Sequence, residues 1–167
     1  APRVRWMVAE TEFARSWALG WNPNAKVALI PHPLRSVFLD KASPTYGPMI
    51  LTVGGLSPRK GVDTVIRGFA GAGVTAAKLV VAGGGPLRDS LETLAADLGI
   101  RDQVEFTGAL ATEEVIRFMN QARSLVVASR VDTSPNVLSE AHAIGLPVIG
   151  TRAGGIPEMI EDGVDGF

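Results

Sequence analysis

The sequence contains no cysteine, which excludes disulfide bonds and thiolate metal sites. Histidine is also scarce, because His32 and His142 are the only two and they stand far apart in the chain. No histidine cluster that could hold a metal ion is therefore visible. From these absences we expect no protein-bound metal.

An excess of charge of one sign is lacking too. Sixteen Lys and Arg residues stand against seventeen Asp and Glu residues, so the formal net charge is −1. No basic run and no basic–aromatic pattern occurs, which argues against a surface for nucleic acid or for an anionic membrane. The composition favours a small molecule as the binding partner.

Long apolar runs are absent as well. No stretch approaches the roughly 18 residues of a membrane-spanning helix, and no signal peptide is present. We therefore expect a cytoplasmic protein, or one peripheral to the inner face of the membrane in its full-length form. The chain has no initiator Met and stops at Asp165-Gly166-Phe167 without a closing element, so we expect a piece of a longer protein.

The residues that are present suffice for a globular core. Hydrophobic residues make up 46% of the 167 residues, which suits one domain or slightly more. Residues 1–46 lack the pattern of a whole domain: we expect a strand at 4–8, a helix at 10–19 and a strand at 26–30. We interpret residues 1–46 as the end of a preceding domain with its linker, and residues 47–167 as a ligand-binding domain.

From residue 49 onward, short apolar runs alternate with segments of helical periodicity. The apolar runs cover residues 49–53, 78–82, 104–107, 124–128 and 147–151. The helical segments cover residues 62–70, 86–98, 112–121 and 135–144. This alternation predicts an α/β fold with a parallel sheet and helices on both faces. Because ligands bind beyond the carboxyl ends of such strands, the loops that follow them are the candidate site.

The loop after the fourth apolar run, residues 129–140, carries the strongest site signal. Ser134 followed by Pro135 predicts a helix that begins at about Pro135, with Ser134 as its cap. The backbone N–H groups of Asn136 and Val137 would then lack intrahelical acceptors. Together with the positive end of the helix dipole, these groups would suit a phosphate.

Two carboxylates accompany this helix start. Asp132 precedes it, and Glu140 lies one turn inside it on the same face as Ile144. Because an unpaired carboxylate among apolar side chains is unfavourable, a pair of ligand hydroxyls would suit Glu140. The alternatives are that Asp132 caps its own turn, and that Glu140 pairs with a cation such as Arg152 or faces solvent.

A glycine loop follows the first apolar run. Gly54 and Gly55 permit a close backbone approach, and Arg59 or Lys60 could neutralise a diphosphate. The order of residues is not that of a P-loop, because the Gly-Lys-Ser/Thr sequence is missing.

Two other loops give weaker signals. The glycines at 83–85 match a dinucleotide fingerprint only in part, since Arg88 takes the place of the third glycine and no acidic residue closes the following strand. An NAD-type site is therefore disfavoured. The loop at 107–110 offers backbone groups for the edge of a base and Leu110 for its face.

Taken together and in this order, the loops resemble the C-terminal half of the group 1, glycogen-synthase-like (family 4) retaining glycosyltransferases, which have the GT-B fold of two facing Rossmann-like domains. The resemblance runs from about residue 30 to residue 167. It is carried by VGGLSPRKG at 53–61, GGGPL at 83–87, FTG at 106–108, Ser129, the segment 132–140 and GGIPE at 154–158. Asp132 and Glu140 fall on the family's acid-x7-Glu positions.

The resemblance implies which residues bind the donor, a nucleoside-diphosphate sugar. Glu140 would accept hydrogen bonds from the ribose diol. The backbone amides of Asn136, Val137 and Leu138 would lie near the diphosphate, and Leu110 near the base. No cofactor is implied, since the nucleotide-sugar is a substrate.

The same resemblance implies Lys60 and Asp132 as the catalytic residues. Lys60 would stabilise the leaving diphosphate, the task that a metal ion performs in other transferases, and Asp132 would lie near the donor sugar. Gly54, Gly55 and Arg59 would complete the phosphate loop. The family usually has Arg at position 55 and Glu at positions 59 and 132, so this chain departs from it at all three.

We therefore expect the donor-binding part of a metal-independent retaining glycosyltransferase. Its acceptor-binding N-terminal domain would be missing, apart from what residues 1–30 contribute, and the fragment alone is expected to be inactive. Two other functions remain open. One is a nucleotide-sugar epimerase of GT-B fold, and the other is a non-catalytic nucleotide-sugar binding module, which Gly55 and Asp132 would suit.

Overall fold

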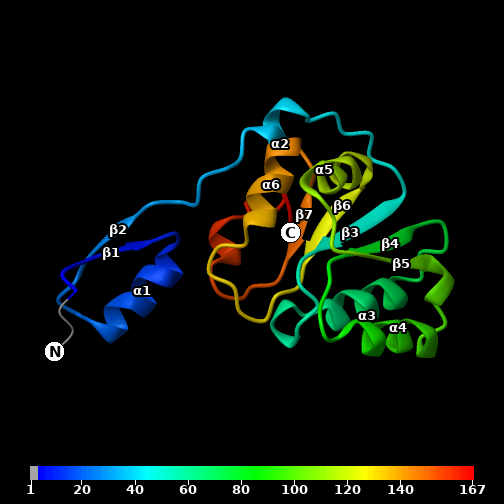
Figure 1. Ribbon diagram of the computed structural model, residues 1–167, viewed down its shortest axis with the longest axis horizontal. Helices are drawn as coiled ribbons and strands as arrows, with labels where there is room; N and C mark the ends of the chain where they lie inside the picture. Colours follow the sequence, from blue (N-terminus) through cyan, green and yellow to red (C-terminus); the bar gives the residue numbers. More distant parts are fainter. Residues whose placement is uncertain (1–3) are drawn as a thin grey trace.

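The computed structural model describes residues 4–167, which form two parallel sheets. Strand β1 (Trp6–Ala9), helix α1 (Glu12–Trp21) and strand β2 (Lys26–Leu29) make a two-stranded parallel sheet with its crossover helix. This N-terminal unit, residues 6–29, lies to one side of the molecule (Figure 1). The expected strand, helix and strand are present with small shifts at their ends, while residues 1–3 of the predicted N-terminal segment lie outside the described part.

The connection between the two sheets carries a short helix that the sequence analysis did not predict, α2 (Val37–Asp40). Its Phe38 is fully buried in the core of the domain that follows. A helix of one turn is too short to show a hydrophobic period, so only tertiary packing reveals it.

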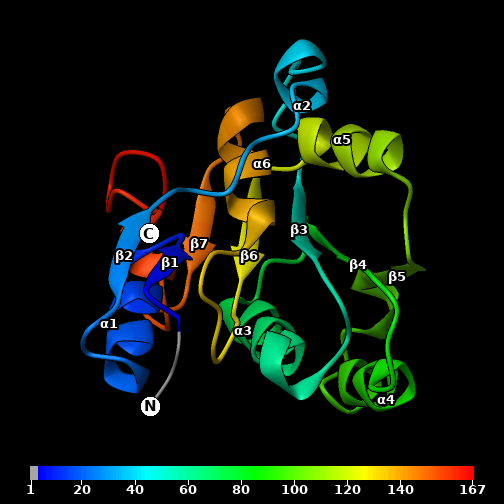
Figure 2. The same cartoon turned by 60° about the vertical axis from the view of Figure 1, so that its left-hand side comes forward.

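The main sheet has five strands in the order β5-β4-β3-β6-β7 (Figure 2). They are β3 (Met49–Val53), β4 (Lys78–Ala82), β5 (Val104–Gly108), β6 (Ser124–Val127) and β7 (Val148–Gly150). All neighbouring pairs are parallel. The order reverses between β3 and β6, which is where doubly wound sheets bind their ligands.

Helices cover both faces of this sheet. Helices α3 (Val62–Ala72) and α4 (Arg88–Asp97) pack on one face, and α5 (Thr112–Gln121) and α6 (Asn136–Ile144) pack on the other with α2 (Figures 1 and 2). Within residues 4–167, three 3₁₀ turns complete the fold: η1 (Pro58–Lys60), η2 (Arg101–Gln103) and η3 (Ile156–Glu158). The predicted α/β fold with helices on both faces is confirmed.

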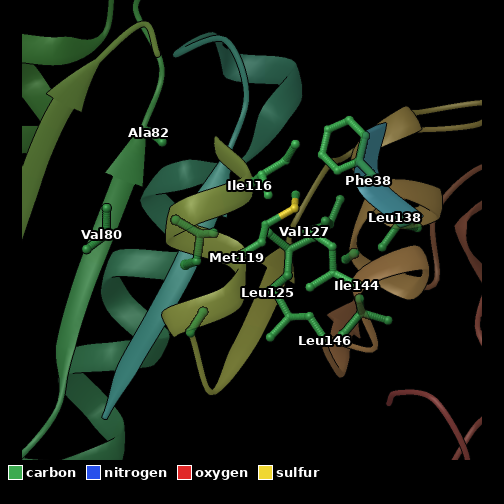
Figure 3. Close-up of a cluster of buried hydrophobic side chains, with 14 of the residues drawn as sticks. Phe38, Val80, Ala82, Ile116, Met119, Leu125, Val127, Leu138, Ile144 and Leu146 are labelled. Carbon is green, nitrogen blue, oxygen red and sulfur yellow. The ribbon is translucent and has the colours of Figure 1, made fainter. Parts of the chain in front are cut away.

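Strand β4 shows why its sequence is a continuous apolar run. Val80 and Ala82 contribute to the core cluster beneath α5 and α6, whereas Leu79 and Val81 contribute to the cluster beneath α3 and α4. A strand that is buried on both faces needs apolar residues at every position. Figure 3 shows the first cluster, in which side chains from α2, α5 and α6 meet those of β6.

No helix in residues 4–167 has both the length and the apolar character that crossing a membrane requires.

Candidate functional site

A cleft of about 390 Å³ opens beyond the carboxyl ends of β3 and β6. The loop after β3 forms one wall, and the loop after β6 with the start of α6 forms the other. The lining residues are Val53, Gly54, Gly55, Lys60, Asp132, Ser134, Pro135, Asn136, Val137 and Glu140. Most of the residues that the sequence predicted as a site are thus brought together at the point where the strand order reverses.

Lys60 and Asp132 form an ion pair across the cleft. The Lys60 ammonium donates to Oδ2 of Asp132 at 2.7 Å, and a guanidinium nitrogen of Arg59 lies 3.6 Å from the same oxygen. Asp132 is only 8% exposed, so its carboxylate needs these cations. The two residues predicted as catalytic are therefore direct neighbours, and Arg59 lies beside them.

The turn that carries Lys60 is held in place by Arg130. The backbone N–H of Arg130 donates to the Arg59 carbonyl at 2.8 Å, and its guanidinium donates to the Pro58 carbonyl and to the Asp63 carboxylate. The hydrogen bond from Arg130 is the main cause that lowers the pKa of Asp63 below its ordinary value. The loop after β6 therefore fixes the glycine loop after β3.

Gly61 allows this close contact between the two loops. Its φ is +61°, and a Cβ at this position would overlap the carbonyl oxygen of Ala128. Both the left-handed backbone and the lack of space require glycine. The glycine that follows Lys60 thus sets the separation between the cleft walls.

The start of α6 differs from the prediction by one residue. Helix α6 begins at Asn136, and Pro135 is an extended cap residue with ψ of 112°. The predicted capping by Ser134 is wrong, because its hydroxyl contacts the sulfur of Met159 at 3.7 Å and no side chain caps the helix.

The N-terminal amides of α6 are divided between the cleft and the helix. Within residues 4–167, no acceptor pairs with the backbone N–H of Asn136 or Val137. The N–H of Leu138 instead donates to the Pro135 carbonyl at 2.9 Å, and the Leu138 side chain is fully buried. The helix thus already uses the Leu138 amide, and a role for it near a diphosphate stays a prediction.

Glu140 pairs with a cation from the interdomain connection. A guanidinium nitrogen of Arg35 donates to Oε1 of Glu140 at 2.7 Å, while the other terminal nitrogen donates to the Thr112 hydroxyl at 2.9 Å. The Glu140 side chain is 16% exposed. Glu140 thus pairs with a cation, as the alternative interpretation of this residue expected, but the cation is Arg35 and not Arg152.

Leu110, like Arg59 and Leu138, is a predicted binding residue that does not line the cleft. Leu110 is half-buried and packs against the core cluster beneath α5 and α6. Gly54 and Gly55 do line the cleft, and the N–H of Gly54 is already paired with the Ala82 carbonyl at 2.9 Å.

The side chains and amides of the cleft suit an anion bearing hydroxyl groups. Lys60 and Arg59 supply positive charge, and the amides of Asn136 and Val137 add donors at the positive end of a helix. Across residues 4–167, the acidic and histidine side chains form no group of three that could hold a metal ion.

The family model of the glycosyl transferases group 1 matches residues 38–167. The chain belongs to this family. The resemblance carried by its glycine loops and acid-x7-Glu spacing is therefore confirmed.

Named relatives of this group 1 chain come from several bacteria. It is 35% identical over 129 residues to a GDP-mannose-dependent alpha-(1-6)-phosphatidylinositol monomannoside mannosyltransferase of Mycobacterium tuberculosis, which covers 72% of the chain and 34% of that relative. It is 32% identical over 135 residues to a D-inositol 3-phosphate glycosyltransferase of Acidothermus cellulolyticus, covering 74% of the chain and 30% of the relative. The chain thus spans about a third of the length of these relatives.

Solved structures agree with the fold of the group 1 chain. HepE of Anabaena in complex with UDP superposes with a TM-score of 0.84 at 20% identity, over 98% of this chain and 49% of that one. Sucrose-phosphate synthase of Thermosynechococcus elongatus gives a TM-score of 0.85 at 23% identity, over 97% of this chain and 44% of the other. The Rossmann-like fold of one half of a GT-B enzyme is therefore confirmed, while the roles of the cleft residues stay predictions.

Proposed function

We propose that this chain is the donor-binding part of a metal-independent retaining glycosyltransferase that uses a nucleoside-diphosphate sugar. The observation that carries the proposal is the convergence of Lys60, Asp132 and Glu140 on one cleft at the strand switch point. The relatives named above are glycosyltransferases, and the HepE structures hold UDP or UDP-glucose.

The diphosphate is assigned to the Lys60 side of the cleft. There Lys60 and the start of α6, with the amides of Asn136 and Val137, line the same cleft, so a diphosphate between the two walls would meet positive charge on both sides. Glu140, one turn deeper in α6, then faces the ribose diol, because a carboxylate accepts hydrogen bonds from two neighbouring hydroxyls.

Transfer breaks the bond between the anomeric carbon and the diphosphate oxygen. The acceptor hydroxyl oxygen forms the new bond to that carbon, and its proton leaves with the diphosphate. Lys60 stabilises the charge that develops on the leaving group. When the Lys60 ammonium pairs with the diphosphate, its ion pair with Asp132 is broken. The Asp132 carboxylate can then face the hydroxyls of the donor sugar.

Nucleotide binding by the Glu140→Gln variant tests the proposal. A thermal-shift screen against UDP-, GDP- and ADP-sugars selects the best nucleotide, and calorimetric titration then compares the variant with the parent chain. We expect a loss of about 1–3 kcal/mol in binding, with the unfolding temperature nearly unchanged. Exposed Glu105, on β5, provides the matched Glu→Gln control.

Unchanged affinity with a lower unfolding temperature would show that Glu140 serves only as the ion-pair partner of Arg35. The full-length protein separates the remaining functions. Transfer to an acceptor excludes an epimerase, and activity that disappears in a folded Lys60→Ala variant excludes a non-catalytic module.

A further inference from the structure

The GGIPE segment at 154–158 contacts the N-terminal unit, far from it in sequence. The two carboxylate oxygens of Glu158 accept hydrogen bonds from the backbone N–H groups of Glu12 at 2.6 Å and Phe13 at 2.7 Å. These are first-turn amides of α1, which have no acceptor inside the helix. In Figure 1, α1 faces the orange-red segment that contains these residues. A carboxylate of the main domain thus caps a helix of the N-terminal unit.

This contact differs from the role that the local sequence suggests for Glu158. Pro157 followed by Glu158 is typical of a helix start, at which the carboxylate would complement the helix dipole. Residues 156–158 form only the short turn η3, and the carboxylate reaches α1 instead. The capped helix lies about 145 residues away, so no local pattern could indicate it.

Thr11 ties the same end of α1 to the loop that carries Asp132. Its hydroxyl accepts from the N–H of Ala14 at 3.2 Å and donates to the carbonyl of Thr133 at 3.0 Å. Thr11 is only 6% exposed, so this polar contact is shielded from water. The cap residue of α1 therefore touches the residue next to Asp132.

The two glycines of the 154–158 segment also contact the loop that carries Asp132. The N–H of Gly155 donates to the carbonyl of Asp132 at 2.9 Å. A Cβ on Gly154 would overlap the same carbonyl, and a Cβ on Gly155 would overlap the Thr133 carbonyl and crowd Thr11. Helix α1, the loop at 132–133 and the 154–158 segment thus form one interlocked contact.

We propose that Glu158 is a positioning residue that latches the N-terminal unit onto the loop of Asp132, so that the docking of α1 and the placement of Asp132 are coupled. Glu158 also lines a second cleft of about 270 Å³ between the two units. Glu10 and Thr11 line it from the N-terminal unit, and Ser134 lines both this cleft and the candidate donor cleft. The coupling does not depend on which nucleotide the donor cleft binds.

Amide hydrogen exchange, followed by NMR on this 167-residue chain, tests the latch. Glu158→Ala removes both acceptors, and we expect exchange at Glu12, Phe13 and Gly155 to accelerate by about tenfold or more. Glu158→Gln keeps one acceptor oxygen without the charge and should give a smaller increase. The strand β4 should exchange at the parent rate in both variants, because its core is untouched.

Two further variants make the test specific. Glu161→Gln changes an exposed carboxylate just after the same segment and should leave all these rates unchanged. Thr11→Val removes the hydroxyl link to Thr133 and should also accelerate amide exchange at Gly155. Three results with Glu158→Ala would each overturn the proposal. They are unchanged amide exchange at Glu12 and Phe13, faster exchange in α1 without faster exchange at Gly155, and an equal acceleration of exchange in β4.

Discussion

The guanidinium of Arg35 donates a 2.7 Å hydrogen bond to the carboxylate of Glu140, so the group that we assign to the ribose already has a partner. Arg35 belongs to the connection between the two sheets and also binds Thr112 of α5. A ribose diol that uses Glu140 must therefore displace this cation or share the carboxylate with it.

Replacing Arg35 by Ala should tighten nucleotide binding. The Arg35 side chain is more than half exposed, so the ion pair is worth at most about 1 kcal/mol, and the gain is limited to roughly fivefold. Calorimetric titration of the parent and Arg35→Ala chains measures it, with exposed Arg152→Ala as the control for loss of one positive charge. Weaker binding by Arg35→Ala would instead show that Arg35 holds Glu140 in its binding orientation.

Lys60→Ala should weaken binding of a nucleoside diphosphate far more than binding of the bare nucleoside. The ammonium acts on phosphate charge, and losing a charge-assisted hydrogen bond costs about 1.5–3 kcal/mol. UDP against uridine, or GDP against guanosine, gives the comparison by titration. Equal losses for the diphosphate and the nucleoside would remove Lys60 from the phosphate site.

Arg59→Ala is the matched control for Lys60→Ala. Arg59 lies 3.6 Å from the same Asp132 oxygen, compared with 2.7 Å for Lys60, and its side chain is more exposed. We expect Arg59→Ala to lose less affinity for the diphosphate than Lys60→Ala does. High salt should reduce this loss, because exposed charges are screened.

Gly61→Ala should destabilise the chain by more than about 1 kcal/mol, because the position has positive φ and a Cβ would overlap the Ala128 carbonyl. Chemical denaturation measures the change. Gly68→Ala is the control, since Gly68 lies within α3 and a Cβ there meets no atom within 4 Å. That variant should be neutral or more stable, because alanine favours the helix. An equal loss in both variants would contradict the assigned packing of Gly61.

The elements that were predictable are those whose own residues carry the signal. The bounds of β3, β4 and α5 match the predicted runs, since a strand buried on both faces is apolar throughout and α5 has a clear apolar stripe. The cleft walls were also predictable, because loops after parallel strands meet at one edge of the sheet.

The missed features depend on contacts between distant residues. Arg35 reaches Glu140 across 105 residues of chain, and Glu158 reaches Phe13 across 145. Such pairings form only in the packed fold, so no spacing of residues in the sequence predicts them.

The 167-residue chain should bind nucleotide but transfer no sugar. Holding a donor and an acceptor in reacting geometry contributes roughly 7–11 kcal/mol when fully realised, and we assign the acceptor surface to a domain that precedes this one. The donor cleft is lined only by residues of the main domain, from Val53 to Glu140, so water reaches the position of the reacting carbon. Slow hydrolysis of the donor is the most that this arrangement supports.

Mass spectrometry checks this expectation. The chain is incubated with the nucleotide-sugar that binds best and with lipid, sugar and protein acceptors, and the full-length protein serves as the positive control. A new glycoside should form only with the full-length protein, because only there would both walls of the reaction site be present. Transfer by the 167-residue chain at rates near those of the full-length protein would place the acceptor site within residues 4–167, and the second cleft between α1 and α6, lined by Thr11 and Ser139, would be the place to search for it.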